Sequence, residues 1–206
     1  MVLSGDPYIG KEIGGAYRIT ARINCGAFGC VYQAQHIFFE EDPIVAIKLL
    51  QGLVVSEEDR QHFIQEARLL RKLKHPHILP ILNVAIQDNV PYIVMEYSTG
   101  GSLKDRLRGR KGQPLPQEEA LTILKQVGDA LHYAHQQHVV HRDLKPDNIL
   151  FNANGDALLA DFGIAAILSS GTKNMGRGGT PAYMAPEQFQ GMVSPKSDQY
   201  ALGCIA

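Results

Sequence analysis

The sequence of 206 residues has little that is typical of secreted, membrane-spanning or nucleic-acid-binding proteins. Its three cysteines, Cys25, Cys30 and Cys204, are too few for a disulfide scaffold, so a reducing compartment and a cytoplasmic location are expected. The first residues lack the basic and apolar blocks of a signal peptide. No uninterrupted apolar run approaches the roughly 18 residues of a membrane helix. Lys and Arg number 20 against 21 Asp and Glu, so the basic surplus expected for a nucleic-acid partner is missing.

The composition that remains is that of an ordinary globular protein, with 45% hydrophobic and 20% charged residues. Residues 1–16 show no periodic pattern and are expected to form a flexible leader. From Tyr17 the pattern alternates with period two, breaks at a glycine-rich turn and resumes, which predicts two strands joined by that turn. A third strand is expected over 44–49.

The order of the remaining elements predicts the fold class. A helix is expected to begin at Ser56 and to stop before Pro76, and a long amphipathic helix is expected after Pro116. Strands that come first and helices that come later indicate an α+β fold with two lobes. The small lobe, mostly antiparallel strands with one helix, is expected over 17–97, and the mainly helical lobe over 98–206.

The glycine-rich turn, Asn24 to Val31, is the first candidate for a binding site. Small residues let backbone N–H groups approach phosphate oxygens without Cβ clashes. Because the turn joins two strands, it differs from a dinucleotide-binding turn and from a Walker loop, which also needs G-K-[ST]. Taken alone, the pattern is more often an ordinary glycine-rich hairpin.

Two charged residues occupy apolar surroundings. Lys48 ends the apolar strand V-A-I-K, and Glu66 follows Phe63 by three residues and precedes Leu70 by four, on or beside the apolar face of its helix. A buried charge is costly unless it is paired, so the two are expected to pair at an anion-binding site. The alternative is that each is a surface charge whose stem lies along apolar surface.

Three polar residues in the second half of the chain can take part in catalysis and metal binding. Asp143 and Asn148 lie in the loop H-R-D-L-K-P-D-N, and Asp161 opens D-F-G after an apolar run. One carboxylate can orient or deprotonate a hydroxyl nucleophile, and the other, with an amide oxygen, can hold Mg²⁺. The tripeptides H-R-D and D-F-G, in this order and after the glycine-rich turn and V-A-I-K, are not a chance combination.

From about Tyr17 to Ala206 the chain resembles a eukaryotic-like (Hanks-type) serine/threonine protein kinase domain, most closely those of bacteria. The resemblance is carried by H-R-D-L-K-P-D-N, by G-T-P-A-Y-M-A-P-E-Q and by S-D-Q-Y-A-L-G. It implies a bilobal fold and the Mg²⁺-dependent transfer of the γ-phosphate of ATP to Ser/Thr hydroxyls of protein substrates, in signal transduction. Dimerisation of the kinase domain is compatible with it.

The resemblance also implies a nucleotide site. The glycine-rich loop would cover the phosphates, apolar residues would sandwich the adenine, and backbone groups between the lobes would hydrogen-bond it. Lys48 would contact the α- and β-phosphates and pair with Glu66. The cofactor-binding residues so implied are Ile23, Asn24, Cys25, Gly26, Ala27, Phe28 and Gly29 for the loop, Lys48 for the phosphates, and Val31, Ala46, Leu150, the gatekeeper Met95 and the backbones of Glu96 and Ser98 for the adenine.

The catalytic roles follow from the same resemblance. Asp143 would be the base for the substrate hydroxyl, and Lys145 would steady the γ-phosphate and favour Ser/Thr over Tyr. Asn148 and Asp161 would hold Mg²⁺. Asp198 would brace the backbone of the H-R-D loop.

Residues 161–187 resemble an activation segment. A phosphate on this segment would pair with Arg142, and Thr172 is expected to be the main autophosphorylation site. Thr180 would pack against the catalytic loop and help to select Ser/Thr substrates. The regulatory residues implied are Arg142, Ser169, Ser170, Thr172 and Thr180. The alternative for the segment is a polar loop without a regulatory role.

One residue departs from the family pattern, and two groups of residues, cysteines and histidines, have other possible roles. Asn24 replaces the usual first glycine, but Asn tolerates left-handed backbone better than most residues. Cys25 and Cys30 flank the loop tip and are expected to act as small apolar residues, with a redox switch as the alternative. His132 and His135 are spaced by three, with His138 next, yet nothing nearby completes a zinc site.

The chain ends at Ala206 within an apolar pattern, so the helical lobe is expected to be incomplete, ending near the start of a central helix that begins near Ser197. Bacterial members of the family often carry a membrane span, a sensor or a repeat domain beyond the kinase domain. The alternative functions are a pseudokinase-like nucleotide-binding or scaffolding module, an inactive kinase fragment, and a small-molecule kinase on a related fold.

Overall fold

The computed structural model describes residues 5–26, 29–39, 41–50, 56–162 and 180–206. The chain divides into two compact units, one of Met1–Ala67 with Pro80–Tyr97 and one of Arg68–Leu79 with Ser98–Ala206. The chain passes from one unit to the other three times, the last time between Tyr97 and Ser98. Residues 68–79 group with the second unit, and the division into lobes at 97/98 stays a prediction.

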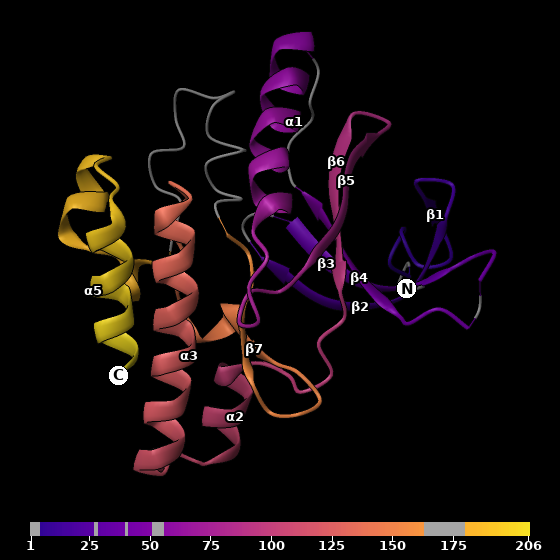
Figure 1. Cartoon of the computed structure of the whole chain (residues 1–206). Helices are drawn as coiled ribbons and strands as arrows, with labels where there is room; N and C mark the ends of the chain where they lie inside the picture. Colours follow the sequence, from indigo (N-terminus) through magenta and orange to yellow (C-terminus); the bar gives the residue numbers. More distant parts are fainter. Residues whose placement is uncertain (1–4, 27–28, 40, 51–55, 163–179) are drawn as a thin grey trace. The chain divides into compact units, whose positions relative to one another are not determined.

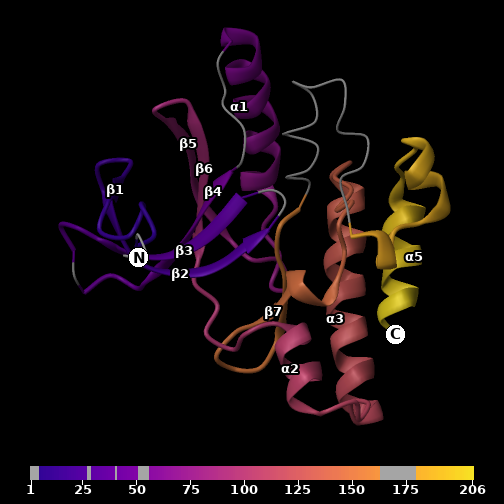
Figure 2. The same ribbon diagram turned by 180° about the vertical axis from the view of Figure 1, so that it is seen from behind.

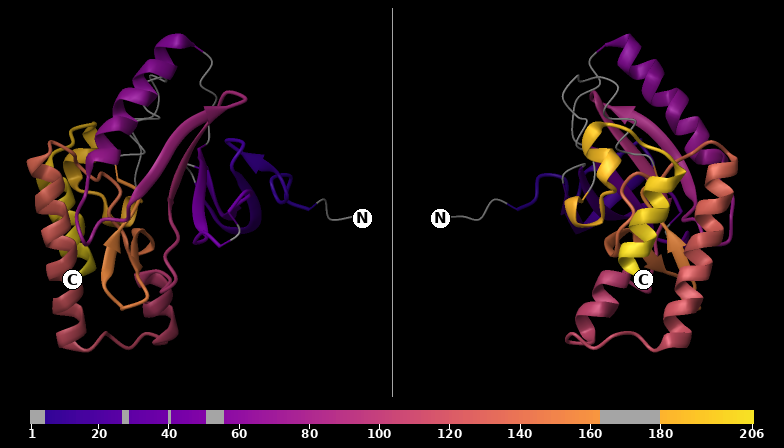
Figure 3. Two further views of the ribbon diagram at one scale, coloured as in Figure 1. Left: turned by 45° about the vertical axis from the view of Figure 1, so that its right-hand side comes forward. Right: turned by 90° about the vertical axis from the view of Figure 1, so that its left-hand side faces the viewer.

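The first unit is built on an antiparallel sheet with the strand order β1-β2-β3-β4-β6-β5 (Figure 1). Figure 3 shows the hairpin of β5 and β6 from two other sides. Helix α1 begins in this unit and ends in the second. The helix expected between Ser56 and Pro76 is thereby confirmed. The elements are β1 (Glu12–Ile13), β2 (Tyr17–Gly26), β3 (Gly29–His36), β4 (Val45–Leu50), α1 (Glu57–Lys72), β5 (Ile81–Gln87) and β6 (Val90–Glu96).

The register of the strands gives the sheet two different faces. Strand β4 lies between β3 and β6 and is buried along its whole length. Directly opposed residues on antiparallel strands point to the same face, and neighbours along a strand point to opposite faces. One face therefore carries the core cluster of Ile13, Ile19, Tyr32, Ala34, Val45, Ile47, Leu49, Tyr92 and Val94. The opposite face carries Val31, Ala46, Lys48, Ile93 and Met95, paired across β3, β4 and β6.

The described part of the expected leader is attached to the sheet. Strand β1 pairs with β2, and the Asp6 carboxylate accepts hydrogen bonds from the Tyr8 amide, the Tyr32 hydroxyl and the Arg22 guanidinium. The rings of Tyr8 and Tyr32 lie 5.7 Å apart. Individual side chains, and not a repeating apolar face, attach this segment to the sheet. Its sequence therefore shows no periodic pattern.

Cysteines 25 and 30 differ from the expectation of two free thiols, because they form a disulfide. They stand directly opposite each other across the β2–β3 hairpin, with their Cα atoms 4.1 Å apart. That spacing brings the side chains of opposed residues within bonding reach. Cys204 is a free, exposed cysteine.

The second unit is mainly helical. Helix α3 lies beside α5 and packs against β8, while α2 contacts β7 (Figure 2). The long amphipathic helix expected after Pro116 is confirmed as α3, which buries the face of Ile123, Val127, Ala130, Leu131 and Ala134. Its elements are α2 (Leu103–Gly109), α3 (Gln117–Gln136), β7 (Ile149–Phe151), β8 (Ala157–Leu159) and α5 (Pro195–Ile205). Within the described residues, no helix is both long and apolar enough to cross a membrane.

Candidate active site

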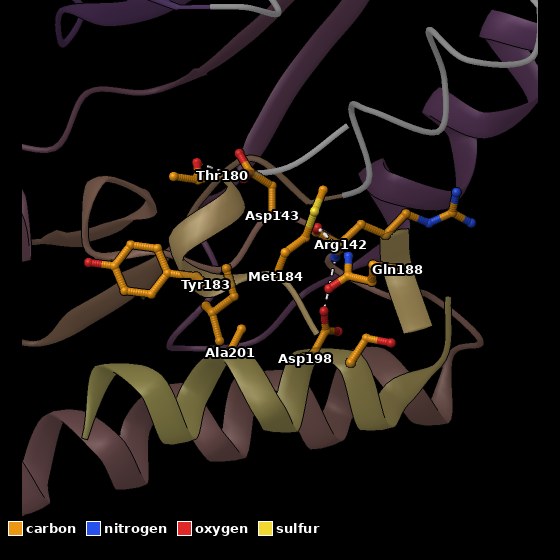
Figure 4. A pocket seen from close by; sticks show the side chains of 10 residues that line it. Arg142, Asp143, Thr180, Tyr183, Met184, Gln188, Asp198 and Ala201 are labelled. Carbon is orange, nitrogen blue, oxygen red and sulfur yellow. Dashed lines mark hydrogen bonds between the residues drawn. The ribbon is translucent and has the colours of Figure 1, made fainter. Parts of the chain in front are cut away.

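A triangle of hydrogen bonds surrounds the carboxylate of Asp143. Lys145 Nζ donates to Asp143 Oδ2 at 2.7 Å and to Thr180 Oγ1 at 2.9 Å, and Thr180 Oγ1 donates to Asp143 Oδ1 at 3.2 Å. Figure 4 shows Thr180 and Asp143 side by side. Asp143 is 9% exposed, so its charge needs such partners. The contacts join the H-R-D loop to a segment that follows it by 35 residues or more.

Asn148 links this carboxylate to the Asp161 segment. In the 3-10 turn Pro146–Asn148, the buried Asn148 side chain donates from Nδ2 to the Asp143 carbonyl at 2.8 Å. Its own carbonyl accepts from the Ala160 amide at 2.9 Å, which places the residue before Asp161 against the turn. Asp161 has a φ of 64°, in the left-handed region, directly after the β7–β8 hairpin. Two residues predicted as metal ligands thus belong to hydrogen-bonded segments.

The donor set of these two residues fits Mg²⁺. Asn148 uses its amide nitrogen for Asp143, so its amide oxygen is the atom suited to a cation, and Asp161 offers carboxylate oxygens. Mg²⁺ prefers oxygen ligands and is usually bound by one or two protein groups together with substrate phosphates. No cluster of three or more His, Cys, Asp or Glu suited to a metal occurs in the described part of the chain.

His141 fixes the loop from inside the unit. It is 1% exposed, its Nε2–H donates to the Ala160 carbonyl at 2.8 Å, and its Nδ1 accepts from the Asp143 amide at 3.3 Å. These two contacts require the neutral ring with its proton on Nε2. The ring also packs on Phe162 of D-F-G, with centroids 4.7 Å apart.

The buried carboxylate of Asp198, on α5, holds the same loop from the other side. Its oxygens accept from the backbone amides of His141 at 2.8 Å and Arg142 at 2.9 Å, which is the bracing expected of this residue. Arg142 has a φ of 72°, a conformation that costs free energy in a residue with a side chain. The carboxylate therefore stabilises a strained loop beside Asp143.

Four of the nucleotide-binding residues expected in the first unit share one face of its sheet. Val31 is opposed to Lys48, and Ala46 is opposed to Met95. Lys48 is 5% exposed, and Glu66 lies partly buried on α1. The pairing of Lys48 with Glu66 stays a prediction.

The glycine-rich hairpin has one position where only glycine fits. Gly29 has a φ of 135°, and a Cβ there would lie 2.0 Å from the Leu49 carbonyl oxygen. At Gly26 nothing lies within 4 Å of such a Cβ. Asn24, the departure from the usual glycine, accepts the Cys25 amide on its Oδ1, and the strand pairing continues past it.

Two adenine-site residues expected in the second unit lie in one hydrogen-bonded region. The Ser98 hydroxyl donates to the Phe151 carbonyl at 2.5 Å, and Leu150 forms a bridge with Ser102. Gly100 approaches the Phe151 backbone so closely that a Cβ would lie 2.5 Å from its carbonyl oxygen. The segment after Tyr97 is therefore held against β7.

Comparison with known proteins assigns this arrangement to a family. The family model described as protein kinase domain matches residues 17–206. The chain belongs to the protein kinase family. It is 39% identical over 201 residues to the serine/threonine-protein kinase PrkC of Bacillus subtilis, covering 96% of this chain. It is 36% identical over 203 residues to the DNA damage-responsive serine/threonine-protein kinase RqkA of Deinococcus radiodurans, covering 95% of this chain.

The kinase fold is also seen in a solved relative. The kinase domain of PknI from Mycobacterium tuberculosis matches with a TM-score of 0.74 and 34% identity, over 94% of this chain and 73% of that one. The bilobal α+β fold class expected from the sequence is therefore confirmed. The chain spans 30% of the length of PrkC and of RqkA.

The kinase site contains residues that the sequence did not single out for it. His135, considered there only for zinc, reaches Asp198 with its Nε2 at 2.8 Å. Gln188 donates to the Arg142 carbonyl at 3.1 Å and accepts the Ala185 amide on its Oε1. His135 lies in the last turn of α3, next to the buried Ala134. This position beside the buried face of the helix is the local feature that could have indicated its contact with Asp198.

Figure 4 shows a pocket whose walls are the H-R-D loop, the segment that begins at Thr180, and α5. It is lined by Arg142, Asp143, Leu144, Thr180, Tyr183, Met184, Gln188, Ser197, Asp198 and Ala201. The expected site residues that lie outside the described part of the kinase chain are Ala27, Phe28, Ser169, Ser170 and Thr172.

Proposed function

We propose that this chain is the catalytic part of an ATP-dependent protein kinase that transfers the γ-phosphate of ATP to Ser/Thr hydroxyls of proteins. The observation that carries the proposal is the hydrogen-bonded group of Asp143, Lys145 and Thr180. A base, a cation and a hydroxyl held together in this way match the needs of phosphoryl transfer, which depends on positioning and on charge stabilisation.

Each member of this group has a defined task. Asp143 orients the substrate hydroxyl and accepts its proton, at the oxygen Oδ1 that the Thr180 hydroxyl contacts at 3.2 Å. Lys145 already uses two of its three N–H donors on Asp143 and Thr180, so one remains for an oxygen of the transferred phosphoryl group. His141, Asn148 and Asp198 keep the loop in place through its backbone.

For nucleotide binding we propose the residues that the sequence predicted. Val31, Ala46 and Met95 provide an apolar surface on the sheet face that also carries buried Lys48. Asn148 and Asp161 would hold Mg²⁺, which when bound neutralises charge on the phosphates. Autophosphorylation at Thr172, with Arg142 as the partner of the phosphate, is proposed as the regulation, and a kinase-domain dimer as the assembly.

The decisive experiment is the intact mass of the purified 206-residue chain after incubation with Mg-ATP, beside the variant Asp143→Asn. We expect phosphate adducts in the wild type only, and peptide mapping then tests Thr172. Transfer to a protein acceptor, but not to a sugar or an antibiotic acceptor, distinguishes a protein kinase from a small-molecule kinase. A folded wild-type sample that binds nucleotide and gains no phosphate would contradict the proposal and favour the pseudokinase alternative.

A further inference from the structure

The disulfide Cys25–Cys30 is a feature that the phosphoryl-transfer chemistry does not use. The two residues oppose each other across the β2–β3 hairpin, while the next residue, Val31, is opposed to Lys48. Neighbours along a strand point to opposite faces. The disulfide therefore lies on the face of the sheet away from Val31 and Lys48, where it leaves the proposed nucleotide surface open.

The two sulfur atoms have unequal surroundings. Cys25 is exposed, whereas Cys30 is partly buried and packs against the core cluster of the first unit. Reduction of a disulfide begins with a thiolate that attacks an accessible sulfur. Cys25 Sγ is therefore the sulfur that an external thiol reaches, and Cys30 is the leaving thiolate.

The bridge also lies at a defined place in the hairpin. Residues 25–30 form a closed ring when it is present, and the strand pairing extends to Gly26 opposite Gly29. On the β3 side of this ring, Gly29 lies directly against the Leu49 backbone. A covalent link here joins β2 to β3 at the end of the hairpin that is proposed to cover the phosphates, and it leaves fewer conformations than are open to the reduced chain.

We propose that Cys25 and Cys30 form a redox switch that sets the affinity of the glycine-rich loop for nucleotide, a proposal that rests on the kinase function proposed above. The reductant is a dithiol. One of its thiolates attacks Cys25 Sγ, and Cys30 leaves and takes up a proton. The second thiol of the reductant then displaces Cys25, which leaves as a thiol, so that two electrons pass from the dithiol to the cysteine pair and the dithiol becomes a disulfide.

The direction of the switch follows from the ordering of the loop. A loop that is already restricted loses less conformational freedom when it binds, so the oxidised form binds nucleotide more tightly. Reduction is expected to weaken the binding of Mg-ATP about threefold to tenfold. In reducing compartments of mesophiles, disulfides are usually transient and redox-sensing or catalytic, which agrees with a switch in a chain that has three cysteines.

The test compares both redox forms of the 206-residue chain carrying Cys204→Ala, which removes the remaining thiol. Each form is prepared in dithiothreitol redox buffer, its thiols are trapped with iodoacetamide for mass spectrometry, and the Kd of a non-hydrolysable Mg-ATP analogue is measured by calorimetry. We expect the reduced form to take up two carbamidomethyl groups and the oxidised form none, and the oxidised form to have the lower Kd. The variant Cys30→Ser should show the weaker binding in both buffers.

Hydrogen exchange of the β2–β3 hairpin provides a readout that needs no nucleotide and no variant. Its amides should exchange faster after reduction, while those of α3 should not change. Equal Kd values for the two redox forms, unchanged exchange, or failure of Cys25 to bond Cys30 under oxidising conditions would each overturn the switch. Absence of nucleotide binding in both forms would instead overturn the proposed kinase function, and with it the ligand assigned to the switch.

Discussion

His135 on α3 and Asp198 on α5 are joined by a hydrogen bond of 2.8 Å between Nε2 and Oδ2. The same oxygen of Asp198 accepts the His141 amide, so a side chain of one helix stabilises the carboxylate that braces the catalytic loop. We therefore predict that His135 is a positioning residue, which acts on Asp143 through Asp198 and the loop.

Replacing His135 by Ala should therefore lower both stability and turnover. Asp198 is 2% exposed in its side chain and would lose one of its donors, which should cost about 1–2 kcal/mol of unfolding free energy. Turnover should fall while KM for ATP changes little, since the loop and not the sheet is affected. The matched control is His132→Ala on the exposed part of the same helix, expected within about 0.5 kcal/mol of the wild type. Equal stability of the two variants in urea unfolding would contradict this role.

Asp143→Asn should lower the rate of phosphoryl transfer about 10²–10⁴-fold, because the amide cannot accept the proton of the substrate hydroxyl. Nucleotide affinity should stay within a few-fold of the wild type. The rate is measured with a peptide acceptor and the affinity by calorimetry. Asp88→Asn, at an exposed left-handed position of the β5–β6 turn, is the matched control and should keep full activity. Comparable losses in both variants would rule out a specific role for Asp143.

Thr180→Ala should reduce kcat about tenfold or more, because it removes the hydroxyl that contacts both Lys145 Nζ and Asp143 Oδ1. Thr180→Ser keeps that hydroxyl and should restore most of the activity. Steady-state kinetics with a Ser-containing peptide separate kcat from KM. If Ala and Ser at this position behave alike, the methyl group rather than the hydroxyl carries the effect.

The two glycines of the hairpin should respond differently to Ala. At Gly29 the new Cβ meets the Leu49 backbone, so Gly29→Ala should cost about 2 kcal/mol or more of unfolding free energy. At Gly26 the space is open, so Gly26→Ala should change stability by less than about 0.5 kcal/mol. Gly26→Ala should nevertheless weaken nucleotide binding several-fold if backbone groups there approach phosphates. Thermal unfolding and calorimetry on both variants decide between a structural and a binding role.

The carboxyl group of Glu187 has a pKa below its usual value, chiefly because the Ser197 hydroxyl donates to it, at 2.7 Å. A lowered pKa favours the folded state above the unfolded-state pKa, and this contribution is lost as pH falls through the folded-state value. Ser197→Ala should therefore raise the Glu187 pKa toward its usual value in an NMR titration.

Asp105 is the control for that titration. Its pKa is also below its usual value, and the main cause is a hydrogen bond from a different serine, Ser102. Ser102→Ala should raise the pKa of Asp105 and leave the pKa of Glu187 unchanged. Ser197→Ala should raise the pKa of Glu187 and leave the pKa of Asp105 unchanged. A change at both carboxyl groups in either variant would indicate a global effect instead of the local hydrogen bonds.

Much of the kinase fold follows from local sequence patterns. Period-two alternation from Tyr17 and the apolar run of V-A-I-K indicated the strands, and the apolar spacing after Pro116 indicated α3. The predictions of strands and helices succeed because their signals lie within a few residues of one another. The order of the motifs, from the glycine-rich turn to D-F-G, supported the family resemblance that names Asp143 as the candidate base, and that role stays a prediction.

Only the tertiary structure decided which distant groups meet. No local pattern joins Asp198 to His135, 63 residues earlier. The family resemblance implied that Thr180 packs against the catalytic loop, but the hydrogen bond from Lys145, 35 residues earlier, is a finding of the structure. The attachment of Asp6 to Tyr32 and the bond between Cys25 and Cys30 likewise depend on how β2 and β3 pair. Contacts of this kind produce no periodic pattern in the sequence. Each depends on the path of the whole chain and not on the neighbouring residues in the sequence.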